Sequence, residues 1–201
     1  DGNPDGGVDD DADDASRFPG SRHRRAAARE TSALCYMSRG AANPSRGFVN
    51  EAAVRAFVEA RAADAGCARG RVLDFTGPPF LGDFVAQATA VASCSVLFGP
   101  HGAGLTHLVW LHDKAALLEV YGQGMRPFYF ENLASLAGVS YAGLRVAEVH
   151  AEDHVASNKR RPGTSYYRLD DFDNLTATLR PLCRAATARG SADGPRTAMP
   201  R

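Results

Sequence analysis

Short apolar runs alternate with segments of helical periodicity through the middle of the chain. The apolar runs predict strands at 32–38, 71–75, 95–98, 115–120 and 139–142. Apolar positions with helical spacing predict helices at 50–65, 80–93, 105–111 and 128–137. This alternation is typical of β-α-β units. We therefore expect an α/β fold, a Rossmann-like open parallel sheet with helices on both faces.

The helix expected at 80–93 has a broad apolar face. Its members are Leu81, Phe84, Val85, Ala88 and Val91. Such a face predicts burial against the sheet. A last helix is expected at 170–182.

The two ends of the chain differ in composition from the middle. Residues 1–33 contain an aspartate- and glycine-rich run followed by an arginine-rich run, with few apolar positions. Blocks of opposite charge with little to bury predict a disordered tail. We expect one folded domain at 34–183 and a loose, low-complexity tail at 184–201.

Composition and charge limit the classes of partner. The 201 residues are 44% hydrophobic, which supports a core of ordinary size, and 23 basic residues balance 23 acidic ones. A net charge of zero gives no reason to expect nucleic acid or an anionic membrane as partner. No apolar run approaches the ~18 residues of a membrane span, so we expect membrane association only through segments outside this chain.

Four cysteines are spread widely, at Cys35, Cys67, Cys94 and Cys183. Without a Cys-x-x-Cys pair, a structural zinc site is not expected. Two disulfides and four buried thiols are both compatible with the spacing. Because Cys35 and Cys94 fall in or beside buried strands, free thiols are favoured there. A glycosylation sequon, Asn174-Leu-Thr176, is compatible with secretion.

A glycine-rich turn, Gly99-Pro-His-Gly-Ala-Gly104, joins the strand at 95–98 to the following helix. Strand, glycine turn and helix together offer free backbone N–H groups and a positive helix end to an anion. A tight turn without a ligand is the alternative. The carboxyl ends of parallel strands share one edge of a sheet. We therefore expect Arg39, this turn, and Glu119 with Gly122 and Gly124 to converge on one crevice.

These residue types suit a diphosphate. Arg39 can pair with phosphate oxygens. Glu119 can accept hydrogen bonds from ribose hydroxyls, or it can be a paired structural glutamate. His101 can donate to a phosphate or transfer a proton. His107 and Gln87 are favoured as structural residues.

Several other nucleotide and metal sites are not indicated. There is no Walker Gly-Lys-Ser/Thr, and the glycine spacing is not the Rossmann Gly-x-Gly-x-x-Gly. His101-Gly-Ala-Gly104 resembles an esterase oxyanion loop. A serine hydrolase also needs a nucleophile elbow, and the segment around Ser140 only approximates one. No histidine follows His154, so the triad order cannot be completed.

Three segments together resemble the family 61 glycosyltransferases, a group that includes plant β-1,2-xylosyltransferases and animal O-GlcNAc transferases. They are the nonapeptide Gly99–His107, Tyr36-Met-Ser-Arg39, and Arg46-Gly-Phe-Val-Asn-Glu51. The resemblance covers about 34–141. It implies the second half of a GT-B fold and inverting transfer from a UDP-sugar to a protein or glycan hydroxyl. It also implies a Golgi or endoplasmic reticulum lumen location.

The resemblance also implies roles for individual residues. His101 would be the catalytic candidate, next to the phosphates or the donor sugar. No metal and no cofactor beyond the donor substrate are expected. The alternative is a non-catalytic nucleotide- or partner-binding remnant of such an enzyme. The residues expected to bind the donor are Arg39, Gly99, His101, Gly102, Ala103, Gly104, Leu105, Thr106 and Glu119.

Overall fold

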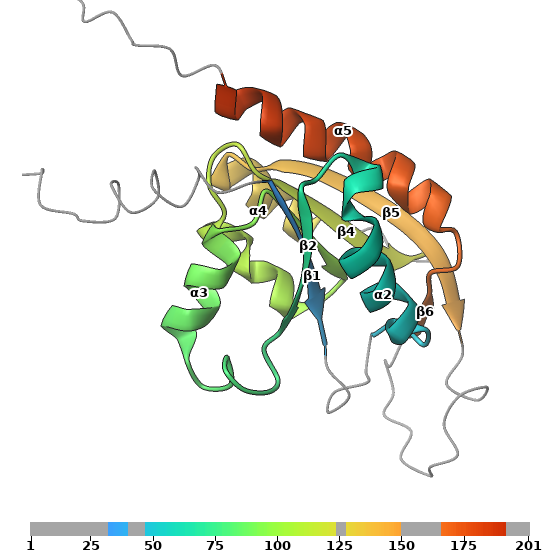
Figure 1. Cartoon of the computed structure of the whole chain (residues 1–201). Coiled ribbons are helices and arrows are strands. Elements are labelled where there is room, and N and C mark those ends of the chain that lie inside the picture. The colour runs from blue at the N-terminus through green and yellow to red at the C-terminus, as the bar shows by residue number, and fades with distance from the viewer. Residues whose placement is uncertain (1–31, 40–46, 124–127, 150–165, 192–201) are drawn as a thin grey trace, which may run out of the picture.

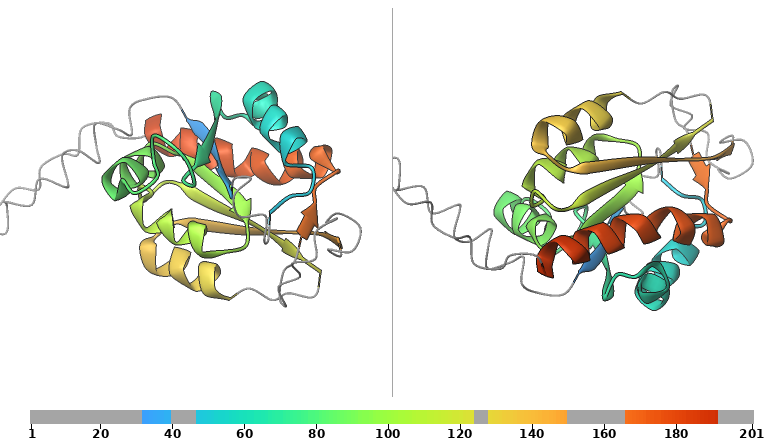
Figure 2. Two further views of the ribbon diagram at one scale, coloured as in Figure 1. Left: turned by 90° about the horizontal axis from the view of Figure 1, so that it is seen from below. Right: turned by 90° about the horizontal axis from the view of Figure 1, so that it is seen from above.

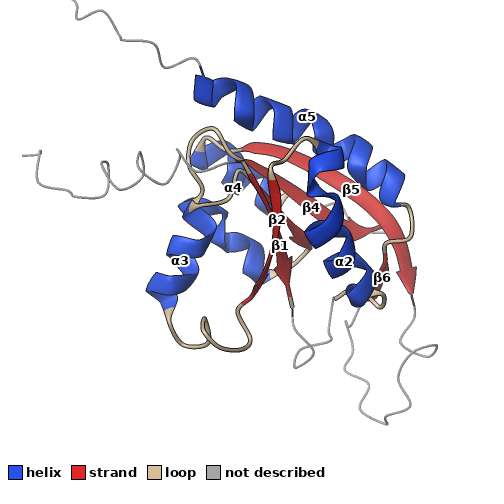
Figure 3. Ribbon diagram, in the orientation of Figure 1, coloured by secondary structure: helices blue, strands red, loops and turns tan. Residues whose placement is uncertain are grey.

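A computed structural model describes residues 32–39, 47–123, 128–149 and 166–191. Figure 1 shows its course, and Figure 3 separates its helices from its strands. The elements are β1 (Ala33–Ser38), α2 (Glu51–Arg61), the 3₁₀ helix η2 (Ala62–Ala65), β2 (Arg69–Asp74), α3 (Phe84–Ala92), β3 (Val96–Pro100), the 3₁₀ helix η3 (Ala103–Trp110), β4 (Ala116–Gly122), α4 (Tyr129–Ala137), β5 (Ser140–Val149), β6 (Tyr166–Arg168) and α5 (Phe172–Ser191).

The strands form one six-stranded sheet in the order β2-β1-β3-β4-β5-β6. Strands β1 to β5 are parallel, as predicted, but β6 runs antiparallel to β5. The expectation of a wholly parallel sheet is therefore wrong at one edge. β5 also continues to Val149, well past the end expected at Ala142. Its last three residues, from Ala147 to Val149, pair with β6, and the residues before them pair with β4.

Helices cover both faces of the sheet, as predicted (Figure 2). α2, η2 and α5 pack on one face, where Leu34 and Tyr36 of β1 join their core. α3, η3 and α4 pack on the other face, with Cys35 and Met37. Successive β1 residues point to opposite faces, so a strand buried on both sides reads as a continuous apolar run.

The helix α3 differs from the one expected. It begins at Phe84, because Asp83 caps it by accepting a hydrogen bond from the Ala86 amide at 2.8 Å. Leu81 therefore lies outside the helix. The predicted buried face is wrong, since Leu81, Phe84 and Val85 are 66%, 56% and 72% exposed. The sheet is contacted through Val91 and its neighbour Ala90 instead.

Two other helices also depart from expectation. The segment after the glycine turn begins at Ala103 and is a 3₁₀ helix. α5 extends to Ser191, so the loose tail expected from residue 184 begins as helix. Near the start of this extension, Cys183 belongs to the core of one sheet face and Ala186 is buried. The tails at 1–31 and 192–201 lie outside the described residues. No helix in the described ranges is long and apolar enough to cross a membrane.

All four cysteines form disulfides, Cys35–Cys94 and Cys67–Cys183. The expectation of free thiols at Cys35 and Cys94 is wrong. Burial alone cannot distinguish a thiol from a disulfide, and here β1 lies beside the end of α3. The second bridge ties the segment before β2 to α5, across 116 residues of sequence.

Candidate functional site

The order of the strands reverses between β1 and β3. β1 leads to β2 on one side, while β3 lies on its other side. In open α/β sheets, ligands bind at such a switch point, outside the carboxyl ends of the strands. Here β1 ends at Ser38, directly before Arg39, and β3 ends at Pro100, directly before the glycine-rich turn. The topology therefore brings the two strongest sequence candidates to one place.

Arg39 contacts the glycine-rich turn directly. Its Nη1 donates a hydrogen bond to the His101 carbonyl oxygen at 3.3 Å. A Cβ atom built at Gly102 would stand 1.7 Å from the same nitrogen. The predicted convergence of Arg39 on the turn is thus present in the fold.

The three glycines of the turn have different surroundings. Gly99 and Gly104 pack against Met37, where a Cβ would lie 3.0 Å and 3.4 Å from its atoms. Gly102 alone faces Arg39. The amides of His101 and Leu105 already donate to the carbonyl oxygens of Val120 and Gly102. The amides at the very start of η3, around Ala103 and Gly104, are of the kind that a helix leaves without an intrahelical acceptor.

His101, Glu119 and Tyr141 form a hydrogen-bonded chain beneath the turn. His101 Nδ1 bonds Glu119 Oε1, and the Tyr141 hydroxyl donates to Glu119 Oε2 at 2.8 Å. Glu119 is fully buried, while the His101 side chain is 13% exposed. Burial and the Glu119 carboxylate raise the pKa of Tyr141 far above its usual value, so its hydroxyl remains a donor.

The hydrogen bonds among His101, Glu119 and Tyr141 limit the chemical role of each residue. Because Nδ1 faces a carboxylate, the proton of neutral His101 is assigned to Nδ1, and Nε2 is left as an acceptor. Such an imidazole can act as a general base. Both oxygens of Glu119 bond to side chains of this chain. Its geometry therefore favours support of the turn over contact with a ribose.

His107 belongs to η3, and its side chain points to α3 rather than to the crevice. Its ring nitrogens face the Gly104 carbonyl and Gln87 Oε1, each at 3.0 Å. Gln87 in turn donates to the Phe80 carbonyl at 2.8 Å. These contacts are in keeping with the prediction that His107 and Gln87 are structural residues.

Of the remaining sequence candidates, few present a side chain to a ligand. The Leu105 side chain is fully buried, and Thr106 is exposed with its hydroxyl donating to the Ala103 carbonyl at 2.7 Å. A Cβ at Gly122 would overlap Glu148, so this glycine allows that side chain to cross the strand. Gly124 lies outside the described residues.

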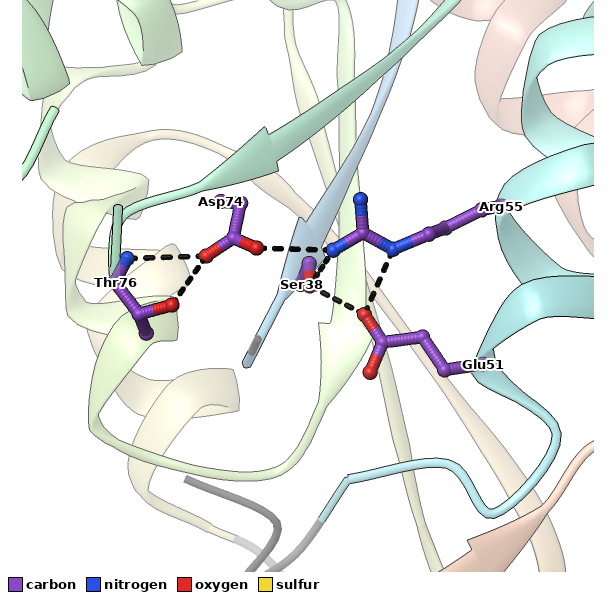
Figure 4. A network of polar contacts seen from close by, with 5 residues as sticks. All are labelled: Ser38, Glu51, Arg55, Asp74 and Thr76. Carbon is purple, nitrogen blue, oxygen red and sulfur yellow. Dashed lines mark hydrogen bonds and ion pairs between the residues drawn. The ribbon is translucent and has the colours of Figure 1, made fainter. Parts of the chain in front are cut away.

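Sequence reasoning missed a polar network at the ends of β1 and β2 (Figure 4). Arg55 of α2 donates to Glu51 at 3.0 Å, to Ser38 at 2.6 Å and to Asp74 at 3.0 Å. Ser38 also donates to Glu51. Asp74 accepts from the backbone amide and hydroxyl of Thr76 at 3.0 Å and 2.6 Å. The network therefore holds the residue that precedes Arg39.

The network also perturbs its own ionisation. Burial tends to raise the pKa of Asp74, but hydrogen bonds from Thr76 and Arg55 outweigh it and hold that pKa below its usual value. A sequence signal existed in the four-residue spacing of Glu51 and Arg55, which predicts an ion pair on one helix.

Two alternative chemistries lack support in the described residues. Ser140 begins β5 and pairs in register with Ala116, at the amino end of the sheet. His101 follows the carboxyl end of β3, so the two cannot form a hydrolase site. No group of three or more His, Cys, Asp or Glu side chains within the described ranges could hold a metal ion.

Known proteins match part of the chain, and the family match includes Arg39 and the glycine-rich turn but ends just before Glu119. A sequence model of the Glycosyltransferase 61 family matches residues 13–118. An EGF domain-specific O-linked N-acetylglucosamine transferase of Bos taurus is 43% identical over 58 residues. This alignment covers 29% of the chain and 11% of that relative.

Two further relatives give the same picture. A beta-1,2-xylosyltransferase of Arabidopsis thaliana is 33% identical over 66 residues, covering 33% of the chain and 12% of that relative. The Drosophila melanogaster EGF domain-specific transferase is 40% identical over 58 residues, covering 29% and 11% respectively. The matching part of the chain thus spans only about a ninth of these relatives.

Proposed function

The chain belongs to the glycosyltransferase 61 family, and we propose that it binds a UDP-sugar at the crevice between β1 and β3. The reaction proposed is inverting transfer of the sugar to a protein or glycan hydroxyl. The printed names of the relatives, an N-acetylglucosamine transferase and a xylosyltransferase, support sugar transfer as the reaction class. The domain would then be the donor-binding half of a GT-B fold.

The observation that carries the proposal is the contact of Arg39 with Gly102 at the switch point. It places a guanidinium beside the first amides of η3. Arginine and a helix start both favour an anion with several oxygens, such as a diphosphate. As the bond to the sugar breaks, the diphosphate gains negative charge. The same groups would stabilise that charge most in the transition state.

His101 is proposed as the general base. An acceptor hydroxyl would give its proton to Nε2 while its oxygen attacks the anomeric carbon. The bond between that carbon and the diphosphate oxygen breaks, and its electron pair leaves with UDP. Glu119 would orient the imidazole and stabilise the imidazolium, and Tyr141 holds the other oxygen of Glu119. Inversion follows from a single displacement at the anomeric carbon.

The two disulfides bear on location. Disulfides persist in oxidising compartments such as the secretory lumen and are rare in the cytosol. The bridges Cys35–Cys94 and Cys67–Cys183 therefore support a Golgi or endoplasmic reticulum lumen location. Asn174 of the sequon is exposed at the start of α5, in keeping with this proposal.

Calorimetric titration of the whole chain with UDP tests the donor site. We expect binding that weakens at least tenfold in Arg39→Ala. The matched control is Arg69→Ala, because Arg69 is exposed at the opposite, amino end of the sheet. Equal effects of the two substitutions, or a folded chain that does not bind UDP, would overturn the proposal.

A second assay separates catalysis from binding. UDP release from a panel of UDP-sugars is measured with wild type and His101→Ala. Release that His101→Ala abolishes, with UDP affinity retained, supports the general-base role. UDP binding with no turnover on any donor favours the non-catalytic alternative.

A further inference from the structure

The sequence contains one N-glycosylation sequon, Asn174-Leu-Thr176, and the fold places it at the start of α5. Asn43-Pro-Ser45 has the same spacing, but proline at the middle position excludes it from recognition. The two disulfides support an oxidising compartment of the secretory pathway, where sequons are modified. The sequon and the disulfides are thus two independent observations that favour the same modification.

The Asn174 side chain is exposed, and only its backbone is tied into the fold. Its amide donates to Asp171 Oδ1 at 2.8 Å, and its carbonyl accepts from the Thr178 hydroxyl at 2.9 Å. Within the described ranges, the structure gives the side-chain amide of Asn174 no hydrogen bond. Attachment of a sugar to this nitrogen would therefore break no contact of the fold.

A polar groove of about 540 Å³ lies beside this position, between η2 and α5. It is lined by Arg61, Asp64, Asp173, Thr176, Ala177 and Arg180. Ala177 adjoins Asn174 on the helix surface, because residues three positions apart are neighbours on a helix. Guanidinium and carboxylate groups can hydrogen-bond the hydroxyls of a sugar. The surface next to Asn174 therefore has both room and polar partners for the first sugar of a glycan.

Thr176 indicates when the modification has to occur. Its side chain is 5% exposed, and its hydroxyl donates to the Phe172 carbonyl at 2.7 Å. A modifying enzyme recognises this hydroxyl together with the asparagine amide, so both must reach one active site. Residues two positions apart on an α-helix do not face the same side. In the folded chain the sequon is therefore closed to the enzyme.

We propose that Asn174 carries an N-linked glycan and that the glycan is attached to the unfolded chain, before α5 packs on the sheet. The donor is a lipid-linked oligosaccharide diphosphate. The Asn174 amide nitrogen bonds to the anomeric carbon of that donor and loses one proton. The bond from this carbon to the diphosphate oxygen breaks, and its electron pair leaves with the lipid diphosphate. The inference rests on the lumenal location in the proposed function but not on the UDP site.

The first test expresses the whole chain behind a cleavable signal peptide in cultured mammalian cells. The chain is recovered from the medium and from the cell extract, and its mass is compared before and after treatment with peptide N-glycosidase. We expect a glycan whose removal leaves aspartate at position 174. An unmodified Asn174 in the wild-type chain, or a glycan at another residue instead, would overturn the inference.

Three variants localise the attachment. Asn174→Gln and Thr176→Val should carry no glycan, and the valine keeps the shape of the buried side chain while it removes the hydroxyl. Thr176→Ser is the matched control, because it keeps the hydroxyl and should keep the glycan. A glycan on Thr176→Val, or none on Thr176→Ser, would contradict recognition of the sequon.

A second test measures the order of modification and folding. The unglycosylated chain, either folded with both disulfides or reduced and alkylated, is incubated with solubilised oligosaccharyltransferase and a lipid-linked oligosaccharide. Alkylation keeps the chain unfolded, because all four cysteines belong to the buried core. We expect about tenfold more glycan on the alkylated chain, because a packed helix opens only rarely. Equal modification of the two forms would show that the folded sequon is open to the enzyme and would overturn the proposed order.

UDP titration of the same samples separates this inference from the proposed donor site. Asn174→Gln should bind UDP as the wild-type chain does, because Asn174 lies on α5 and not at the ends of β1 and β3. A glycosylated chain that does not bind UDP would refute the donor site and confirm the modification. A chain that binds UDP and carries no glycan would refute the modification alone.

Discussion

Arg39 lies over the backbone of Gly102, so close that a Cβ atom at position 102 would stand 1.7 Å from Arg39 Nη1. The two residues follow different strand ends, after β1 and after β3, and lie 63 positions apart in the sequence. Arg39 Nη1 also bonds the His101 carbonyl at 3.3 Å. Glycine at 102 is therefore what allows the guanidinium to rest against the turn.

Gly102→Ala should weaken donor binding and also cost some stability. The new methyl group would push away the far end of the Arg39 side chain, and φ at Gly102 is +156°, a conformation that strains an L side chain. We therefore expect a loss of about 1–3 kcal/mol in the free energy of unfolding. UDP affinity should fall about tenfold, which corresponds to about 1.4 kcal/mol of binding free energy. Gly77→Ala is the control, since nothing lies within 4 Å of its Cβ. Unchanged UDP affinity in Gly102→Ala would contradict this account of the turn.

Glu119→Ala should destabilise the fold. Removing this fully buried carboxylate leaves His101 and the Tyr141 hydroxyl without their partner. We expect a loss of about 2–4 kcal/mol in the free energy of unfolding, measured by urea denaturation. Tyr141→Phe removes one hydrogen bond and should cost about 1 kcal/mol. If Tyr141→Phe lowered stability more than Glu119→Ala, Glu119 would not be the central residue of the hydrogen-bonded chain from His101 to Tyr141.

The parallel part of the sheet could be predicted from sequence because β1, β3 and β4 are buried on both faces and read as unbroken apolar runs. β6 could not, because a strand of three residues has too little periodicity, and it exists through its pairing with β5. The prediction of the buried face of α3 was wrong for another reason. Apolar residues surround that helix, and only the position of the Asp83 cap decides which of them reach the sheet.

The sequence could predict those site residues whose position depends on the strand topology alone. Arg39 and His101 follow strand ends that any parallel arrangement brings to one edge. Tyr141 and Arg55 were missed because their roles depend on which elements are neighbours. Tyr141 reaches Glu119 only because β5 lies beside β4. Arg55 reaches Asp74 only because α2 crosses the ends of β1 and β2.

Asp74→Asn should change stability in a pH-dependent way. The pKa of Asp74 is lower in the folded chain than its ordinary value of 3.8, because hydrogen bonds from Thr76 and Arg55 outweigh burial. The stabilisation that the ionised Asp74 carboxylate gives to the fold is therefore complete above about pH 3.8. It is lost as pH falls through the lower pKa of the folded chain. We expect Asp74→Asn to lower Tm at pH 7 and the deficit to shrink below pH 3.8. The control is Glu59→Gln, an exposed carboxylate on α2. A deficit that stays constant down to pH 2.5 would contradict the assignment.

His112→Asn should make stability depend less on pH in the mildly acidic range. Burial lowers the pKa of His112 from its ordinary value of 6.5, with Asp113 and Lys114 acting in opposite directions. The neutral ring accepts a hydrogen bond from the Lys114 amide at 3.2 Å. As pH falls below 6.5 the unfolded chain takes up a proton before the folded chain does, so stability declines. Asparagine keeps an acceptor and does not titrate. Urea midpoints from pH 7.5 to 5 should therefore fall less in the variant, and parallel curves would refute the role of His112.

Loss of the Cys67–Cys183 bridge should loosen α5 more than the rest of the domain. The bridge spans 116 residues, and chain entropy predicts a loss of about 4–5 kcal/mol in the free energy of unfolding when it is removed. The buried contacts of Leu175 and Leu179 still hold α5 to the sheet. In Cys67→Ala/Cys183→Ala, amide exchange should therefore rise most at Leu179 and less at Leu108, which packs on the opposite face. Because the proposed donor site lies at the strand ends and not beneath α5, UDP affinity should be retained at temperatures where the variant is folded. An equal rise in exchange at both amides would show that α5 unfolds only with the whole domain.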